Sequence, residues 1–180
     1  MGMSGHNKWS KIKRQKEKTD AQKSKVFSKM AKLISSASRI TKGDVNSPSL
    51  RAVIEKAREF NMPSDNIDRA VKKGAGGEGE HLDAITYECY GPGGSALIIE
   101  ALTTNRNKAA QEIKHVLSLN GFELATPGSA LWAFTKEPHS TEWIPNSTTP
   151  LSSEDESTLE KLINDLEENE EVQDVYTNAD

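Results

Sequence analysis

AITYECYGPGGSALIIEALTTN, residues 84–105, is the stretch in which the chain first shows the pattern of a sheet. Residues 84–90 and 95–103 are rich in β-branched and aromatic side chains, which favour strands. Gly91-Pro92-Gly93-Gly94 separates them and supplies the residue types that tight turns require. Asn105 is a favourable N-cap. The pattern therefore predicts a β-hairpin followed by a helix.

The residues after this helix continue the alternation of helices and strands. Further strands are predicted at 122–124 and 130–135. In the second of these, Trp132 and Phe134 are expected to share one face, because side chains alternate along a strand. Residues 137–152 contain three prolines and many Ser and Thr, a composition that indicates a loop.

The C-terminal part ends in a helix and a strand. Ser153 and Glu156 have the spacing of a capping box and predict the start of the helix. The apolar positions of this helix are Leu159, Leu162, Ile163 and Leu166, and those of the strand are Val172, Val175 and Tyr176. The predicted fold class is therefore α+β, with helices packed on one face of a mostly antiparallel sheet.

Three helices are predicted in the N-terminal half. The first spans residues 20–41, where apolar side chains recur every three or four positions. These side chains are Val26, Phe27, Met30, Leu33, Ile34, Ala37 and Ile40. The second helix begins at Ser47-Pro48, and the third runs from Ser64 to an expected stop at Gly74. The first half of the chain is therefore expected to be a three-helix domain.

The charges are divided between the two halves, although the formal net charge is only −4. Residues 1–73 contain 18 Lys or Arg and 7 Asp or Glu, and residues 74–180 contain 5 and 20. We therefore expect a basic arm and helical domain over 1–73, a Gly-rich linker over 74–82, and an acidic α+β domain over 83–180. Such a division suggests different partners for the two halves.

The N-terminal arm is the strongest indication of function. Residues 1–32 contain 10 Lys or Arg and two acids, a pattern that favours binding to the phosphates of a nucleic acid. The residues expected to neutralise phosphates are Lys8, Lys11, Lys13, Arg14, Lys16, Lys18, Lys23 and Lys25. Trp9 is expected either to contact a base or to anchor the arm on the helical domain. A solvated tail is the alternative for the whole arm.

Arg106 and Lys108 form a second, smaller candidate contact. They stand at the predicted start of the helix after the hairpin, where free backbone amides can also bind an anion. Simple capping by Asn105 is the alternative. The acidic domain itself is expected to face solvent or a protein partner.

The sequence offers little for catalysis. Its four histidines, His6, His81, His115 and His139, are scattered, and no zinc-ligand spacing or nucleophile motif is present. The single cysteine, Cys89, lies in a predicted strand and is expected in the core; a lone cysteine also fits a reducing compartment. We therefore expect no enzyme, no cofactor, no metal and no membrane segment, and a cytoplasmic location.

Several ordered motifs resemble one known family. They are GHNKWSKIK (5–13), VIEKA (53–57), NMPSDNIDRAVKKG (61–74), ITYECYGPGG (85–94), TNRN (104–107) and GSALWAF (128–134). WIPN (143–146) and EEVQDVYTN (170–178) resemble the C-terminal part of the same family. On these motifs the chain resembles the YebC/PmpR family.

The resemblance implies a non-enzymatic bacterial protein, named in that family as a probable DNA-binding transcriptional regulator. Mitochondrial relatives act as translational activators, and some bacterial members are linked to the ribosome. Family members are usually longer, with a third α/β module between GSALWAF and the C-terminal helix. Only a short loop connects these segments here, so the resemblance implies a shortened member without that module.

The sequence leaves three functions open: two that involve binding to nucleic acid and one that does not. The first is DNA-binding transcription regulation, and the second is a ribosome- or RNA-associated translation factor. The arm is rich in lysine and poor in arginine, which favours contact with folded RNA phosphates over bidentate reading of bases. The third is an interaction protein that works through its acidic domain.

Overall fold

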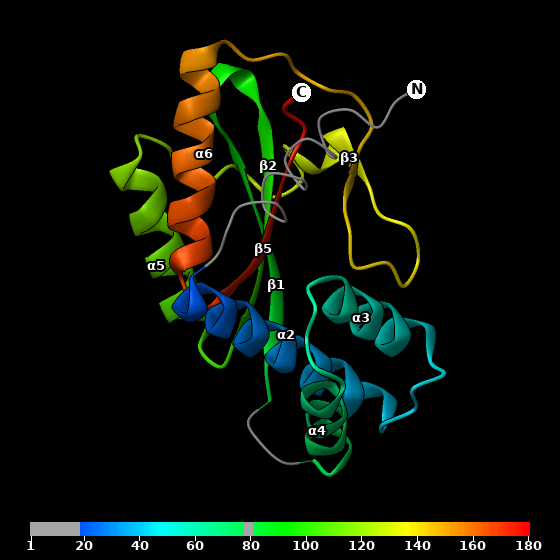
Figure 1. The fold of residues 1–180 in the computed structure, drawn as a ribbon. Coiled ribbons are helices and arrows are strands. Elements are labelled where there is room, and N and C mark those ends of the chain that lie inside the picture. Colours follow the sequence, from blue (N-terminus) through cyan, green and yellow to red (C-terminus); the bar gives the residue numbers. More distant parts are fainter. Residues whose placement is uncertain (1–18, 78–80) are drawn as a thin grey trace. The chain divides into compact units, whose positions relative to one another are not determined.

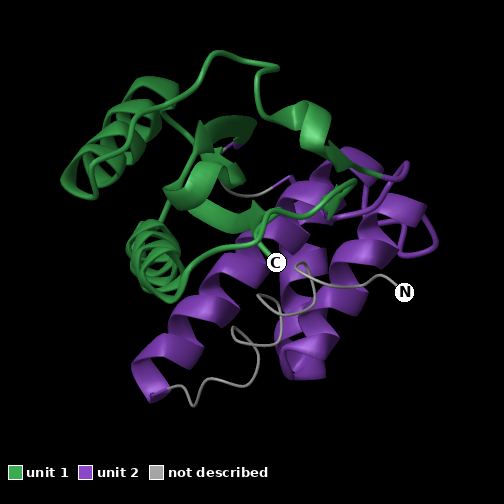
Figure 2. Ribbon diagram, turned by 90° about the horizontal axis from the view of Figure 1, so that it is seen from above, with its two compact units in different colours: residues 1–13, 83–136, 143–180 green, residues 14–82, 137–142 purple. Residues whose placement is uncertain are grey.

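The computed structural model describes residues 19–77 and 81–180 (Figure 1). The described chain divides into two compact units, coloured separately in Figure 2. Of the described residues, the helical unit contains 19–77, 81–82 and 137–142, and the α/β unit contains 83–136 and 143–180.

The helical unit consists of α2 (Asp20–Thr41), α3 (Pro48–Glu59) and α4 (Ser64–Ala75). All three helices begin where the sequence predicts them. They bury a common apolar core. Its members are Met30, Ile34, Leu50, Val53, Ile54, Ala57, Met62, Ile67 and Ala70.

Two expectations about these helices are corrected. Gly74 does not stop α4, which continues to Ala75; the glycine is buried and lies against α2. Ile40 is not part of the buried face of α2, because its side chain is 78% exposed. Ile40 follows the buried Ile34 by six residues, so at 3.6 residues per turn its side chain points about 120° away from that of Ile34.

The α/β unit contains a three-stranded sheet in the order β1-β2-β5. The strands are β1 (Asp83–Tyr90), β2 (Ala96–Thr103) and β5 (Val172–Thr177), and both pairings are antiparallel. The hairpin between β1 and β2 turns through a short 3-10 helix, η1 (Pro92–Gly94). Gly93 and Gly94 have φ of 66° and 77°, values that favour glycine. The predicted hairpin and last strand are confirmed.

Two helices cover one face of this sheet, α5 (Arg106–Leu119) and α6 (Ser153–Glu168). Leu97, Ile99 and Val175 of the sheet pack with Ile113 of α5 and Leu162 of α6 in one core. The α+β fold class with helices on one face of an antiparallel sheet is therefore confirmed.

The start of α6 lies one residue earlier than the predicted capping box. Ser152 is the N-cap, and its hydroxyl oxygen accepts a hydrogen bond from the Asp155 amide at 3.1 Å. Ser153 is already helical. Adjacent serines have the same capping chemistry, so the sequence alone does not separate them.

The segments predicted as strands at 122–124 and 130–135 lie on different faces of the sheet: Phe122 and Leu124 pack against the core on the helix side, whereas Ala130, Ala133 and Phe134 cover the opposite face. Residues 122–124 contribute a single bridge, between Leu124 and Cys89. Residues 130–135 form a 3-10 turn, η2 (Leu131–Ala133), and only then a two-residue strand, β3 (Phe134–Thr135). This strand pairs with β4 (Ile144–Pro145).

Trp132 and Phe134 consequently do not share a face. Phe134 is buried against the sheet, whereas Trp132 is 65% exposed. The cause is the buried Glu88 carboxylate, which accepts backbone hydrogen bonds from Gly128, Ala130 and Leu131 at 2.6–2.9 Å. Amides bound to Glu88 cannot take part in a strand ladder, so the chain curls over the sheet.

Candidate nucleic-acid interface

Most of the predicted arm residues lie outside the described part of the chain. They are Lys8, Trp9, Lys11, Lys13, Arg14, Lys16 and Lys18. The structure describes four of the predicted contacts, Lys23 and Lys25 on α2 and Arg106 and Lys108 on α5.

The described chain begins with the capped first turn of α2. The Thr19 hydroxyl oxygen accepts a hydrogen bond from the Gln22 amide at 3.2 Å, and the Gln22 side chain accepts one from the Thr19 amide at 2.9 Å. Lys23 is exposed and Lys25 is half-buried. Side chains two positions apart in a helix are about 200° apart around its axis. Lys23 and Lys25 therefore do not face the same ligand surface.

Arg106 and Lys108 are paired with carboxylates of their own unit. Arg106 Nε lies 3.3 Å from Asp83 Oδ2, and Lys108 Nζ lies 3.3 Å from Glu171 Oε1 and 3.9 Å from Glu112 Oε1. The hydrogen bond to Glu171, assisted by the charges of Glu112 and Glu171, raises the pKa of Lys108. A phosphate at this position would compete with carboxylates that already balance both cations.

The start of α5 is also capped. The Asn105 side-chain oxygen accepts a hydrogen bond from the Lys108 amide at 3.1 Å, so the capping interpretation of Asn105 is what the structure shows. One of the amides that could have bound an anion is thereby satisfied.

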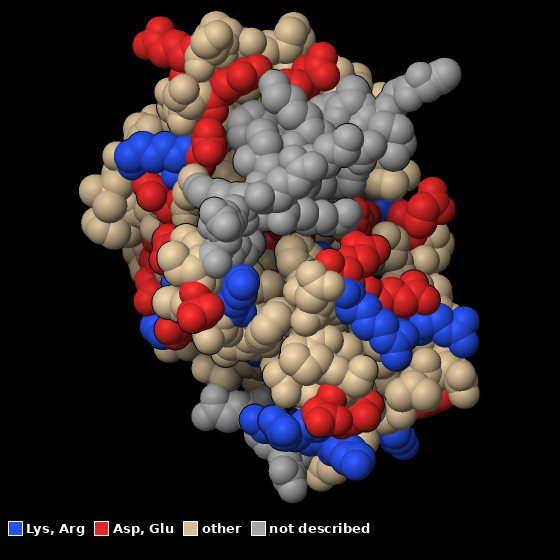
Figure 3. Space-filling view, viewed as in Figure 1, with Lys and Arg blue, Asp and Glu red and all other residues tan. Residues whose placement is uncertain are grey.

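The helical unit carries a second group of cations that sequence reasoning missed. Residues 19–77 contain 12 Lys or Arg and 6 Asp or Glu, whereas residues 83–180 contain 5 and 18. Figure 3 shows Lys and Arg side chains gathered over α3 and α4, while α6 carries mostly Asp and Glu. Arg51 and Arg58 of α3 are seven residues apart and therefore lie on one helix face. That spacing was the available signal.

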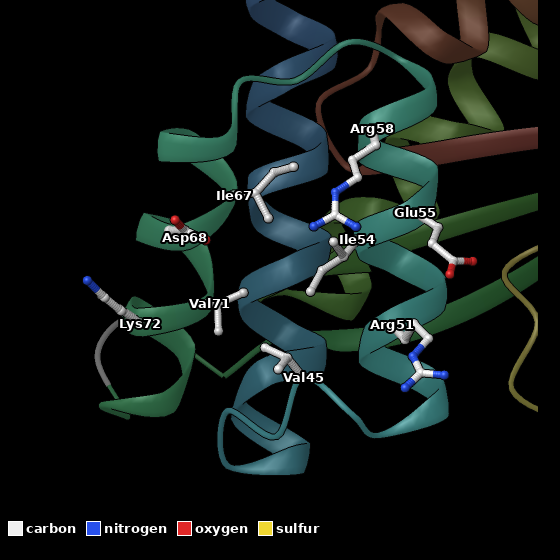
Figure 4. Close-up of a pocket in the computed structure, with 9 residues that line it drawn as sticks. All are labelled: Val45, Arg51, Ile54, Glu55, Arg58, Ile67, Asp68, Val71 and Lys72. Carbon is white, nitrogen blue, oxygen red and sulfur yellow. The ribbon is translucent and has the colours of Figure 1, made fainter.

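These cations border a hollow between α3 and α4, drawn in Figure 4. We call it the α3–α4 groove; its volume is about 430 Å³. The apolar lining residues are Val45, Ile54, Ile67 and Val71, and the charged ones are Arg51, Glu55, Arg58, Asp68 and Lys72. A volume of this size lies in the range of sites for small organic ligands.

The α/β unit exposes an ordered tryptophan on the sheet face opposite the helices. Trp132 Nε1 donates a hydrogen bond to Tyr90 Oη at 3.0 Å, and that hydroxyl donates in turn to the Ser129 carbonyl oxygen. In the same unit, Lys136 Nζ lies 5.2 Å from the ring centroid of Trp143, within the range of a cation–π interaction. The structure thus holds these aromatic rings in fixed positions.

Other chemical features are limited within residues 19–77 and 81–180. Burial raises the pKa of Cys89 to about 12, which suppresses the reactive thiolate. No group of three or more His, Cys, Asp or Glu among these residues is arranged to hold a metal ion. No helix in this part of the chain has the length and apolar character needed to cross a membrane.

The described structure defines a two-unit α+β protein with a basic helical part and an acidic sheet-containing part. Two family models match it, the TACO1/YebC protein N-terminal domain over residues 7–77 and the TACO1/YebC second and third domain over 82–139 and 135–179. The chain therefore belongs to the TACO1/YebC family.

Individual relatives agree with this assignment. A Fervidobacterium nodosum protein named "Probable transcriptional regulatory protein" is 47% identical over 175 residues, which cover 94% of this chain and 68% of the relative. The Thermoanaerobacter pseudethanolicus protein named "Probable transcriptional regulatory protein Teth39_1009" is 36% identical, with 99% and 97% covered. The crystal structure of the conserved hypothetical protein Aq1575 from Aquifex aeolicus superimposes with a TM-score of 0.78 at 30% identity, covering 96% of each chain.

The alignments also locate a difference in length. The match to the Thermoanaerobacter protein extends over 239 residues, whereas this chain has 180. The match to the second and third domain falls into two segments that meet at residues 135–139. This junction lies between β3 and β4.

Proposed function

We infer that this protein is a non-enzymatic regulator of gene expression that binds nucleic acid through its basic helical unit and N-terminal arm. The observation that carries this proposal is the separation of charge between the units. A polyanion gains affinity chiefly by releasing counterions when clustered Lys and Arg replace them. The acidic α/β unit would be repelled from the same phosphates, which orients the protein on its ligand.

DNA-binding regulation of transcription is the first candidate. Its support is the name of the relatives, which are called probable transcriptional regulatory proteins. In this form the arm residues together with Lys23 contact the phosphate backbone of a duplex in the cytoplasm. Lys25, Arg106 and Lys108 contribute less, because Lys25 is turned away from Lys23 and the other two are paired with carboxylates.

A translation factor that binds ribosomal RNA is the second candidate. It is favoured by the composition of the arm, where residues 1–32 contain nine Lys and one Arg. Lysine is a point charge suited to irregular phosphates, whereas bidentate reading of bases in a duplex groove relies mainly on arginine. The acidic unit would then face a protein partner or solvent.

Crosslinking in cells, followed by sequencing of the bound DNA and RNA, tests the proposal and separates its two forms. Enrichment of promoter-region DNA supports transcription regulation, and enrichment of ribosomal RNA supports the translation factor. A variant that lacks residues 1–18 retains the Thr19 cap of α2 and is the appropriate control. Recovery of neither nucleic acid above that control would contradict the proposal.

A further inference from the structure

We propose that the α3–α4 groove holds an unpaired nucleotide of the bound nucleic acid, with the base on the apolar floor and the phosphate against Arg58 of α3. This inference rests on the proposed function, since it names a contact within the same basic unit. The occupant is a nucleotide that is free of base pairing, as in the loops and bulges of structured RNA.

The floor of the groove is suited to a flat apolar surface. Ile54 and Ile67 are 7% and 3% exposed and belong to the core of the unit, so their positions are fixed by packing. Val71 lies beside them, and Val45 at the mouth is 49% exposed. A base placed there would cover the water-exposed apolar surface of Val45 and Val71.

The charged border complements a phosphate. In Figure 4 the Arg58 side chain reaches from α3 toward α4, in front of Ile54, whereas the Glu55, Arg51 and Lys72 side chains point away from the gap. Arg51 stands two turns away on the same helix, and Lys72 belongs to the opposite wall. A guanidinium group binds phosphate through two parallel hydrogen bonds and also stacks on flat rings.

Arg58 is available to a ligand in the groove, and Arg51 and Lys72 add positive charge at its border. Within residues 19–77 and 81–180, no ion pair or side-chain hydrogen bond of the structure involves Arg51, Arg58 or Lys72. The groove also carries Glu55 and Asp68, so cations outnumber acids by three to two along its border. The excess of one positive charge along the border, together with the apolar floor, favours a ligand that has one negative charge and an apolar part.

The dimensions favour a single nucleotide over a duplex. A duplex keeps its bases stacked inside and presents mainly its backbone, whereas unpaired bases can be splayed into a protein surface. A hollow of about 430 Å³ accommodates one flat group of that kind. A blunt duplex would contact only the charged border.

Binding of two RNAs by the full chain tests the inference. The probes are a blunt RNA duplex and the same duplex with an unpaired bulge. The variants are Arg58→Gln, which removes the phosphate contact, and Val45→Glu, which places a carboxylate at the mouth without disturbing a buried side chain. Arg69→Gln is the matched control, because Arg69 is an exposed cation of α4 that does not line the groove.

We expect both groove variants to weaken binding of the bulged RNA about tenfold, in the range of one lost stacking contact. The blunt duplex should lose about twofold, as should both RNAs with Arg69→Gln. Equal losses for both RNAs would overturn the inference, because the groove would then supply only charge. Unchanged binding of both RNAs would also overturn it while leaving the proposed function intact.

Two further results distinguish the remaining outcomes. If the groove variants bind both RNAs normally but lose binding to a poly-glutamate peptide, the groove holds an acidic peptide and the inference is wrong. If the wild-type chain binds neither RNA nor duplex DNA, the proposed function fails together with it. A photoreactive uridine in the bulge adds a positional readout: crosslinks should map to α3 or α4, and crosslinks confined to the arm would overturn the inference.

Discussion

Gly74 of α4 lies so close to Ser35 of α2 that a Cβ on the glycine would stand 2.3 Å from the Ser35 carbonyl oxygen. Two hydrogen bonds also join α2 to α4 at this contact. Ser35 Oγ donates to the Ala70 carbonyl oxygen at 3.0 Å, and Ser38 Oγ donates to that of Val71 at 2.6 Å. The nearest obstructing atom belongs to the backbone of Ser35, and the next, Ser38 Cβ, is attached directly to the backbone, so neither can yield unless the helix moves.

Gly74→Ala should therefore destabilise the helical unit, although alanine is the better helix former. Overpacking of a tight contact costs about 1–3 kcal/mol, which exceeds the gain in propensity. Urea unfolding monitored by circular dichroism should show the loss, and amide exchange in α2 and α4 should accelerate. Lys73→Ala, at the exposed neighbouring position, should change the free energy of unfolding by no more than about 0.5 kcal/mol. Equal stability of the two variants would contradict the close packing.

Glu88→Gln tests the hydrogen bonds that hold residues 128–131 over the sheet. The buried carboxylate accepts three amides, whereas a glutamine offers one oxygen and turns an NH₂ group toward donors. We expect a loss of about 2–3 kcal/mol in thermal unfolding, since hydrogen bonds to charged groups are among the stronger ones. Trp132 fluorescence should change as well, because this tryptophan follows the segment bound by Glu88. Glu123→Gln, an exposed substitution, should have little effect on either measurement.

Cys89 makes stability depend on pH in the alkaline range. Burial raises the pKa of its thiol from 9.0 to about 12, so the unfolded chain loses this proton at a lower pH than the folded chain. The resulting stabilisation is fully present below pH 9 and is lost as the pH rises toward about 12. Other groups titrate in the same range, so the readout is the difference between wild type and Cys89→Ala. Wild type should lose stability more steeply than the variant between pH 9 and 11, and parallel curves would contradict the shift.

The same burial predicts slow alkylation. At pH 8 the folded chain should react with iodoacetamide about a thousandfold more slowly than the unfolded chain, from the difference in thiolate alone. Mass spectrometry before and after addition of urea measures the ratio. Comparable rates in both states would show that Cys89 is accessible.

The periodic elements could be predicted from the sequence because each is determined by its own residues. The apolar spacing of 20–41 and the hairpin around Gly91-Pro92-Gly93-Gly94 are local patterns, and both are present in the structure. The segment 130–135 could not be predicted in this way. Its residues have strand propensity, but its backbone is bound by Glu88, more than forty positions earlier in the chain. A tertiary hydrogen bond thus overrides the local preference.

The candidate nucleic-acid interface could likewise be predicted only in part from the sequence. The arm is visible as a run of charges, and Arg106 and Lys108 are recognisable at a helix start. Their carboxylate partners could not be foreseen, because Glu171 approaches Lys108 only through the pairing of β5 with β2. The α3–α4 groove was missed for a related reason: its lining residues on α3 and α4 border one hollow only when the two helices pack.

The salt dependence of binding is the most direct test of a phosphate-binding arm. The affinities of the full chain and of a variant without residues 1–18 should be measured for duplex DNA and for ribosomal particles over a series of salt concentrations. If six phosphates are neutralised, the logarithm of the association constant should fall with that of the salt concentration with a slope of about −4 to −5 for the preferred ligand, and the truncated chain should give a much shallower slope. A slope near zero for the full chain, or no affinity for either ligand at low ionic strength, would contradict nucleic-acid binding by this protein.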